Sequence, residues 1–593
     1  MFRGDPCRPW VDIKNRKLLQ RHVSMILLQE FEPIAEKGLD KISAIDFLNT
    51  HLEEFKSFIQ GYESQRVIKL LPKGSIFDFE ELQKQLISAL MSLKTKCDEH
   101  PDLFDTQPFS YESSPKSLLD ALYEESIIPT YSFPKNVVST YITNSEGKIK
   151  YEIDRGLDVA ISEYAPGRAI VVDKQTYQIG GIYAPITRST KNKFEPAKSY
   201  MEDPNYLKTL MKCDNCGWFG LAKDEDHVCP FCGSLGIKED EHKMLRPWGF
   251  APVGARPIAD AQLNETYSSA QQPLYSTLPQ GDEMQVVDNY TYLKMASRTN
   301  QRIIMINRGE RKKGFMVCEQ CGAAMPGNDK KVLNNIPRPY RIKGMTQSRC
   351  LHKYALNVNL GYDFITDMMV LEFAIDSSII DVNSDNKTWI NRASQSMAEA
   401  LRLAASKCLD VDFTELVAGF RLRSSRGGTF VDIYLYDSLS SGAGYSAAAA
   451  NNINEILLET HKLLTDCTCK SACSKCLKHF RNQFDHGLLD RHAAAQLLDW
   501  AKTGEPAVAL RIEEQQELLH PIASILSSKG LDIDFKQDQI SGTCSGYAKE
   551  VVVYPAMWVK PYKENTVFIS DAILRHAKPY AIQELEIGFG LSN

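Results

Sequence analysis

The spacing of apolar residues predicts helices in the N-terminal part of the chain. One apolar stripe with helical periodicity runs from Leu18 to Phe31, and a second runs from Leu82 to Cys97. Asp78 stands just before the second stripe, where its carboxylate suits an N-cap. We therefore expect residues 1–126 to form a helical region.

From residue 127 onward the pattern changes to short runs bounded by proline and glycine. The alternation of polar and apolar residues from Lys148 to Ile153 is typical of a β-hairpin. The sequence predicts a β-rich middle, divided into a β-rich domain at 127–207, a zinc ribbon at 208–240, and a β-rich segment with a second Cys/His metal site at 241–360.

Strand and helix patterns alternate in the C-terminal part. Asp367–Ile375 and Thr429–Asp437 have strand patterns, whereas Trp389–Leu409, residues 446–464 and Gly487–Trp500 have helical ones. We expect an α/β zinc-binding domain at 361–503 and a small α/β domain at 504–593. The predicted fold class is thus a multidomain α+β protein.

Composition limits the possible partners. The 593 residues carry a formal net charge of -6 with a pI near 6.1, which argues against nucleic-acid binding by the whole surface and leaves local binding open. No apolar run of about 18 residues occurs, so we expect no membrane contact. No signal peptide is present, which predicts a reducing, cytoplasmic location.

Eleven of the 15 cysteines fall into three clusters. Cys213, Cys216, Cys229 and Cys232 have the C-x2-C-x12-C-x2-C spacing of a zinc ribbon, with glycines after each pair. Cys318 and Cys321 form a second pair that Cys350 and His352 complete as three thiolates and one imidazole, unless His352 is an ordinary polar residue.

The third cluster is the densest. Cys467, Cys469, Cys473 and Cys476 lie within ten residues, close enough for one tight loop to surround a metal. Zinc is favoured because of the ribbon upstream, an iron-sulfur cluster stays open, and disulfides are disfavoured in a reducing compartment. We expect about three structural zinc ions in all.

Basic residues near the second cluster are candidates for phosphate contact. They lie just before the Cys318–His352 cluster and within its long loop. The predicted nucleic-acid residues are Arg308, Arg311, Lys312, Lys313, Arg338, Arg341, Lys343 and Arg349.

Catalytic motifs are weak by comparison. No Walker A loop occurs, and metal sites closed by four protein ligands lack the open position of a catalytic zinc, so we expect no enzymatic activity of this chain alone. The glycine turn Ser440–Tyr445 is either a tight packing turn or a phosphate cradle. His576 and Lys578 form an H-x-K pair that suggests a phosphodiesterase, although the expected aspartate is replaced by Gln583.

Two segments carry a family resemblance, YDSLSSGAGYSAA and DCTCKSACSKCLKHFRNQFDHGLLDRHAAAQLL. They resemble the C-terminal zinc-binding domain of MrfA-type superfamily 2 DNA helicases, which also occurs in proteins of the DISARM and Druantia antiphage systems. The resemblance implies zinc at Cys467, Cys469, Cys473 and Cys476. This sequence departs from those helicases because the two motor domains that they carry upstream are absent from it.

The expected function follows from these observations. We expect a zinc-binding, DNA-binding accessory subunit, or separated C-terminal half, of a superfamily 2 helicase in bacterial antiphage defence, with a partner helicase subunit supplying ATPase activity. The alternatives are an accessory protein of a DNA-repair helicase and a structural adaptor without DNA contact.

Overall fold

The computed structural model describes residues 16–31, 41–71, 77–99, 101, 104, 115–125, 127–128, 137–144, 146–185, 195–214, 218–221, 228–229, 233–259, 263, 265–268, 274–275, 284–327, 336–341, 349–352, 354–382, 387–425, 428–439 and 442–591. By internal contacts the chain divides into two compact units. Unit 1 comprises residues 1–278, 298–368 and 437–448, and unit 2 comprises residues 279–297, 369–436 and 449–593.

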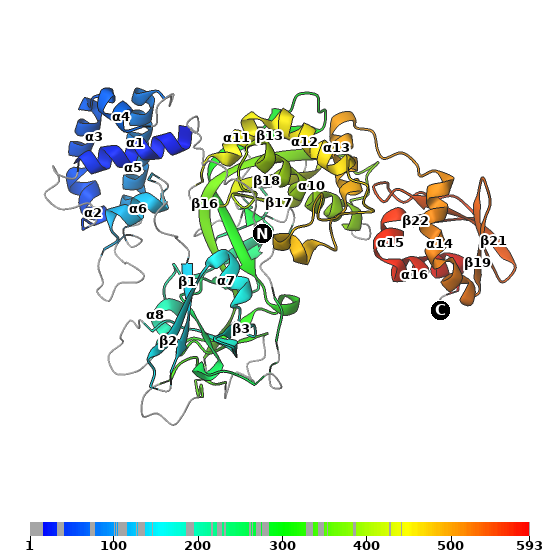
Figure 1. Cartoon of the computed structure of the whole chain (residues 1–593), viewed down its shortest axis with the longest axis horizontal. Coiled ribbons are helices and arrows are strands. Elements are labelled where there is room, and N and C mark those ends of the chain that lie inside the picture. Colours follow the sequence, from blue (N-terminus) through cyan, green and yellow to red (C-terminus); the bar gives the residue numbers. More distant parts are fainter. Residues whose placement is uncertain are drawn as a thin grey trace, which may run out of the picture. The chain divides into compact units, whose positions relative to one another are not determined.

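Helices form the N-terminal part of unit 1, as the apolar stripes predict (Figure 1). Both stripes contribute buried residues to one hydrophobic core. Asp78 Oδ1 accepts hydrogen bonds from the backbone N–H groups of Glu80 and Glu81, which confirms the N-cap. The elements are α1 (Arg16–Phe31), α2 (Ala44–Asp46), the π-helical η1 (Phe47–His51), α3 (Leu52–Gly61), α4 (Ser64–Leu70), α5 (Phe79–Glu99) and α6 (Leu118–Glu124).

A five-stranded sheet in unit 1 contains the predicted hairpin. Its strand order is β2-β1-β10-β4-β3, and β1 pairs antiparallel with β2. Helix α7 (Leu157–Glu163) buries Leu157, Ala160 and Ile161 in the core of this region. The strands are β1 (Val137–Thr143), β2 (Ile149–Gly156), β3 (Ala169–Val172), β4 (Gln175–Ile182) and β10 (Phe250–Pro252).

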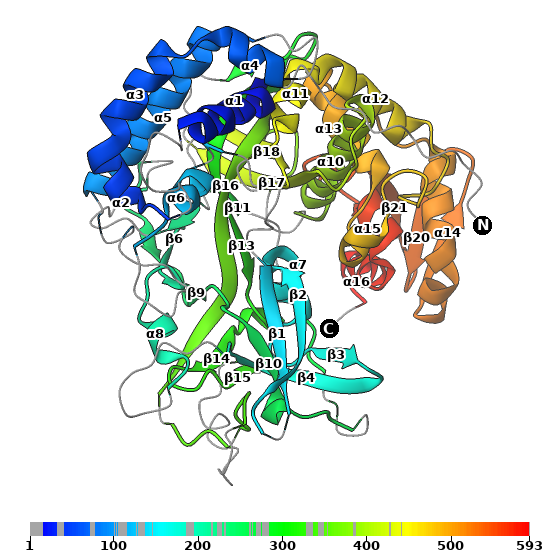
Figure 2. The same cartoon turned by 60° about the vertical axis from the view of Figure 1, so that its left-hand side comes forward.

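A second sheet is built around two long strands, β13 (Leu293–Asn307) and β16 (Ala355–Ile375), which are neighbours in the strand order (Figure 2). Strand β14 (Phe315–Cys318) pairs antiparallel with both β16 and β15 (Ala324–Pro326), and it is buried throughout. This position places Cys318 at the end of a rigid central strand. The shorter strands are β5 (Leu207–Lys208), β9 (Lys243–Leu245), β11 (Leu274–Tyr275) and β12 (Gln285–Val286).

A separate three-stranded sheet occupies the predicted ribbon. Its order is β7-β6-β8, with β6 (Leu210–Cys213) in the centre. The outer strands are β7 (Phe219–Leu221) and β8 (Ile237–Glu239).

Unit 2 contains the α/β region. Helix α10 (Lys387–Cys408) packs against α12 (Ile453–Thr465), α13 (Arg491–Thr503) and β17 (Leu416–Ser425), while β17 pairs with β18 (Gly428–Asp437) (Figure 1). The single helix expected at 446–464 is instead two helices, α11 (Tyr445–Asn451) and α12, with Asn452 between them.

The C-terminal part of unit 2 is a four-stranded sheet with helices. Its order is β19-β20-β21-β22, in which β21 and β22 are parallel. The elements are α14 (Ile512–Ser528), β19 (Leu531–Phe535), β20 (Ile540–Cys544), β21 (Tyr547–Tyr554), β22 (Thr566–Ser570), α15 (Asp571–His576) and α16 (Lys578–Phe589). The α+β fold class is confirmed. Among the described helices, none is long and apolar enough to cross a bilayer.

Candidate metal centres and nucleic-acid interface

The structure brings Cys318, Cys321, Cys350 and His352 together, although a long loop separates the two halves of this set. Cys318 Sγ lies 3.4 Å from His352 Nδ1 and 3.6 Å from Cys350 Sγ. Cys350 Sγ lies 3.7 Å from His352 Nδ1. All four ligand atoms are within 4.8 Å of one another.

These distances fit a single tetrahedral zinc ion. With Zn–S bonds of about 2.3 Å and a Zn–N bond of about 2.0–2.1 Å, the edges of the tetrahedron are about 3.5–3.8 Å. His352 therefore lies where a fourth ligand of such an ion would stand.

The electrostatics of this cluster also suit a cation. Hydrogen bonds from the Cys318 and Cys321 thiols lower the pKa of Cys350 to about 3, and the nearby charge of Arg338 contributes to the shift. Hydrogen bonding to Cys318 and Cys350 raises the pKa of Cys321. Repulsion between like charges disfavours a second thiolate beside the first, and a metal ion would offset that repulsion.

A glycine is required beside this cluster. Gly322 has φ +76°, and a Cβ at this position would meet the Ile182 carbonyl oxygen at 2.1 Å. The turn lets Gly322 N–H donate to the Cys318 carbonyl at 3.0 Å, while Cys321 N–H donates to Cys318 Sγ at 3.5 Å. The backbone thus turns around the sulfur as in a zinc knuckle.

Cys467, Cys469, Cys473 and Cys476 form the second described cluster, here called the 467–476 knuckle. Sγ–Sγ distances are 3.6 Å for Cys467 to Cys473, 3.7 Å for Cys469 to Cys476, and 3.8 Å for Cys473 to Cys476. These distances again match the edges of one tetrahedron around zinc, about 3.8 Å.

The same distances bear on the alternatives. In a cubane iron-sulfur cluster each cysteine binds a different iron, so the thiolates stand farther apart than the edge of one metal's tetrahedron. A disulfide needs an S–S bond of about 2.05 Å, and none occurs among the described cysteines. The spacing favours one zinc ion in this knuckle.

Arg491 holds the 467–476 knuckle in place, and the sequence analysis did not single it out. Its side chain is buried; Nε donates to the Cys469 carbonyl at 3.0 Å and Nη1 donates to the Leu464 carbonyl at 2.9 Å. Its backbone N–H donates to the Ser471 carbonyl at 2.8 Å. The first residue of α13 thereby connects the end of α12 to the metal loop.

A buried charged network fixes the segment after the knuckle. His479 Nε2 lies 2.8 Å from Glu399 Oε1, and Arg402 Nη2 lies 2.6 Å from the same oxygen. Burial opposes ionisation of Glu399, but the hydrogen bonds and charges of His479 and Arg402 outweigh it and lower the pKa of the carboxyl. The backbone N–H of Arg481 lies 3.1 Å from His479 Nδ1, and this contact helps to orient the ring.

The ribbon is only partly described. Cys213 and Cys229 are buried beside Trp218, and Gly233, with φ +68°, donates its N–H to the Cys229 carbonyl at 2.9 Å. Cys216 and Cys232 lie outside the described residues. The zinc site predicted for the ribbon therefore stays a prediction.

The predicted nucleic-acid residues have different surroundings. Arg308 is largely buried, with its guanidinium 2.6 Å from Asp240 Oδ2 and 5.4 Å from the centre of the Phe219 ring. Arg341 Nε donates to the Gly254 carbonyl at 3.3 Å. Arg338 is half-buried near Cys350, Arg349 is exposed, and Lys343 lies outside the described residues.

Arg311, Lys312 and Lys313 form the most accessible group. All three are exposed in the turn between β13 and β14, which contains the 3-10 helix η6 (Glu310–Lys312). Arg311 and Lys312 have φ of +51° and +61°, a left-handed conformation that is unfavourable for residues with a Cβ. The fold therefore maintains a strained turn that displays adjacent positive charges.

The glycine turn after β18 is not arranged as a phosphate cradle. Asp437, fully buried, accepts hydrogen bonds from the backbone N–H groups of Ala443, Gly444, Tyr445 and Ser446. The donors that would bind a phosphate thus already have an anionic partner. The packing-turn interpretation is the one that the structure supports.

His576 also has a structural partner. Its Nε2 lies 2.7 Å from Asp490 Oδ2, and Asp490 caps α13 through its other oxygen, which accepts from the His492 N–H at 3.0 Å. This pairing links α15 to the N-cap of α13.

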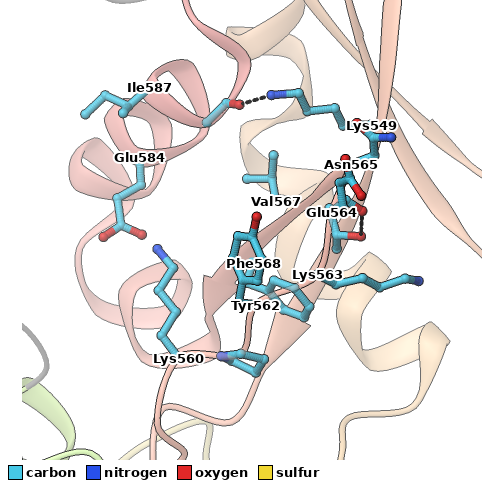
Figure 3. A pocket seen from close by; sticks show the side chains of 13 residues that line it. Lys549, Lys560, Tyr562, Lys563, Glu564, Asn565, Val567, Phe568, Glu584 and Ile587 are labelled. Atoms are coloured by element: carbon cyan, nitrogen blue, oxygen red, sulfur yellow. Dashed lines mark hydrogen bonds between the residues drawn. The ribbon is translucent and has the colours of Figure 1, made fainter.

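A groove between β22 and α16 is lined by three lysines (Figure 3). Lys549 Nζ donates to the Gly588 carbonyl at 2.7 Å, and Lys563 Nζ pairs with Glu550 at 2.7 Å. Lys560 and Glu584 point toward one another in the close view (Figure 3). Since Lys549 and Lys563 already have partners within the domain, the groove is a weak candidate for phosphate binding.

Comparison with known proteins bears on the region that holds the 467–476 knuckle. Residues 397–477, from the middle of α10 to just past the fourth cysteine, match the family described as the MrfA Zn-binding domain. The matched residues comprise the C-terminal half of α10, the β17–β18 pair, α11, α12 and the knuckle itself.

The chain as a whole also has a relative. Over 641 aligned residues it is 28% identical to the Druantia protein DruE of Escherichia coli (strain UMEA 4076-1), and the match covers 97% of this chain and 34% of that protein. The chain thus spans about a third of the length of this relative.

Solved structures give weaker matches. A crystal structure of the DUF1998 helicase MrfA bound to DNA aligns with a TM-score of 0.30 and 13% identity, covering 73% of this chain and 45% of that one. A complex of MrfA with DNA and AMPPNP gives a TM-score of 0.25 and 10% identity, covering 69% and 44%.

Proposed function

We propose that this chain is a zinc-binding, DNA-binding portion of a superfamily 2 helicase system that acts in Druantia-type antiphage defence. It works as an accessory subunit or as the C-terminal half of such a helicase, and a motor from the same system supplies ATP hydrolysis. The similarity to DruE across 97% of the chain is the observation that carries this proposal.

The metal sites support a scaffold role. Both described clusters offer four protein ligands, which leaves no open position for a catalytic water on zinc. Each cluster stiffens a segment next to exposed basic residues. The zinc ions would therefore hold the DNA-binding turns in shape without taking part in chemistry.

Binding of labelled DNA at two salt concentrations tests the proposal. Neutralised phosphates release counterions, so affinity should fall steeply as salt rises. A chain that shows no salt-dependent affinity for single-stranded or duplex DNA would be a structural adaptor, and the DNA-binding proposal would be wrong.

Replacing Arg311, Lys312 and Lys313 together by alanine should weaken DNA binding equally for all sequences. Loss of up to three phosphate contacts should reduce the slope of log K against log salt by about 2–3. Fluorescence anisotropy across a salt series measures both effects.

The matched control replaces Lys529, Lys536 and Lys563 by alanine, which removes the same charge. These three lysines pair with Glu586, Asp534 and Glu550, whereas in the η6 turn the described ion pair is the long contact of Arg311 with Glu310 at 3.9 Å. Equal loss of affinity in both triple variants would show a non-specific charge effect and would contradict the assignment of the η6 turn.

A further inference from the structure

Phe480 stands out on the segment that follows the 467–476 knuckle. Its side chain is 82% exposed, and it is the only phenylalanine among the described residues that lies so largely in solvent. A phenyl ring has no polar group to hydrate, unlike the exposed tyrosines of this chain. Its exposure therefore loses the favourable free energy of burying an apolar ring, and no hydrogen bond to water offsets that loss.

The backbone on both sides of Phe480 is fixed. His479 is anchored to Glu399, and its ring lies 5.1 Å from that of Phe413. Asn482 is buried, accepts from the His479 N–H at 2.9 Å, and donates to the Leu477 carbonyl at 2.8 Å. The 3-10 helix η8 (Phe480–Asp485) thus begins between two anchored residues, and the ring is held outward.

Several basic residues lie close to Phe480 in the sequence. Lys470, Lys475 and Arg481 are exposed and Lys478 is half-buried. No salt bridge to any of the four occurs among the described residues, although Arg481 lies near enough to Asp412 to act on it electrostatically. The stretch 466–486 carries these four cations against two carboxylates, Asp466 and Asp485. Lys475 is also tied to the metal site, because its N–H donates to Cys473 Sγ at 3.4 Å.

A rigid exposed ring beside unpaired cations is the arrangement that binds single-stranded nucleic acid. The ring offers a stacking face to a base, and the cations reach the flanking phosphates. A protein partner would be expected to need a wider apolar patch than one ring. In duplex DNA each base is already stacked on its neighbours, so its face is not accessible to the Phe480 ring.

We infer that the knuckle segment Lys475–Arg481 is a contact site for single-stranded DNA, in which Phe480 stacks on an unpaired base and Lys475, Lys478 and Arg481 contact adjacent phosphates. This inference rests on the proposed DNA-binding function. It specifies the DNA form and a site separate from the η6 turn.

Affinity of the full chain for a labelled single strand and for a duplex of the same sequence tests the inference. Phe480→Ala and Phe480→Leu should each weaken single-strand binding about 5- to 100-fold, while Phe480→Trp keeps it, because stacking needs a ring. The salt slope and the duplex affinity should not change, since no phosphate contact is lost. Tyr547→Ala, which removes a 79% exposed ring on β21, is the matched control and should bind like the parent.

Two further measurements separate stacking from other contacts. The added tryptophan of the Phe480→Trp variant should lose fluorescence on binding the single strand, relative to the parent. Alanine at Lys475, Lys478 and Arg481 together should reduce the single-strand salt slope by about 2.

The outcomes are distinct. If the parent shows no salt-dependent DNA binding, the proposed function fails. If the parent binds but Phe480→Ala or Phe480→Leu binds the single strand equally well, or if the loss is the same on duplex, only the inferred stacking site is overturned.

Discussion

Replacing Cys350 by serine is expected to remove one zinc ion per chain and to destabilise the loop that Cys350 anchors by more than about 3 kcal/mol. Zinc binding contributes about 10–16 kcal/mol to the folding free energy of isolated zinc-finger peptides. The loss of one of four zinc ligands should therefore destabilise the site more than most single cavities in a hydrophobic core do. Serine keeps the size of the side chain but does not ionise to bind zinc.

Zinc per chain, measured by elemental analysis, gives the direct readout. Because a chain of several domains need not unfold in one step, hydrogen exchange at the Cys318–Ala323 turn gives the local stability. Its backbone bonds, Cys318 N–H to the Ala323 carbonyl and Gly322 N–H to the Cys318 carbonyl, should open faster in the variant.

Cys408→Ser provides the control, because Cys408 belongs to neither described cluster. It should leave the zinc content unchanged. An unchanged zinc ratio in Cys350→Ser would contradict the assignment of this site.

Replacing Glu399 by alanine is expected to cost about 3–5 kcal/mol of stability in unit 2, because it leaves the buried Arg402 without its carboxylate and His479 without its acceptor. Both Glu399 and Arg402 are buried, so water cannot replace the lost partner. Chemical unfolding followed by tryptophan fluorescence measures the loss, since Trp389 and Trp500 belong to the same unit.

The contribution of Glu399 should depend on pH in a defined direction. Its pKa is lowered in the folded state, so its stabilising effect is fully present above the unfolded value of about 4.3 and is lost as pH falls through the folded pKa. The difference in stability between parent and variant should therefore shrink in acid.

Glu459→Ala is the matched control, because Glu459 pairs with the exposed Lys407. Surface pairs contribute about 0–1 kcal/mol, so this change should be nearly neutral. Equal losses for Glu399→Ala and Glu459→Ala would show that the buried network is not a main source of stability.

Much of the fold follows from local patterns. The two N-terminal stripes predict α1 and α5 because amphipathic helices bury one face. The strand pattern at Thr429–Asp437 predicts β18, which the structure places at Gly428–Asp437. Strands β17, β19 and β20 were not predicted. They contain arginine, aspartate or glycine at inward or edge positions, and pairing with their neighbours overrides this weak local preference.

The division into two units could not be predicted from contiguous segments. The boundary falls inside long strands, after Ser297 within β13 and after Met368 within β16. A sequence pattern shows that a strand is present but not that its two halves belong to different packed units.

The ligand residues were predictable, and the residues that support them were only partly so. Cysteine spacing identified both described clusters because metal geometry restricts spacing within a loop. Arg491 gave no such signal by itself. Glu399 and Arg402 did leave one, since an i,i+3 charged pair on an alanine-rich, buried helix indicates a buried ion pair.

Single-strand DNA affinity of the zinc-loaded chain, compared with the same chain after chelation and after zinc is restored, tests the central claim most directly. If zinc holds the binding segments in shape, chelation should abolish salt-dependent binding, and zinc should restore it. A zinc-free chain that binds DNA as tightly as the loaded one would contradict the account.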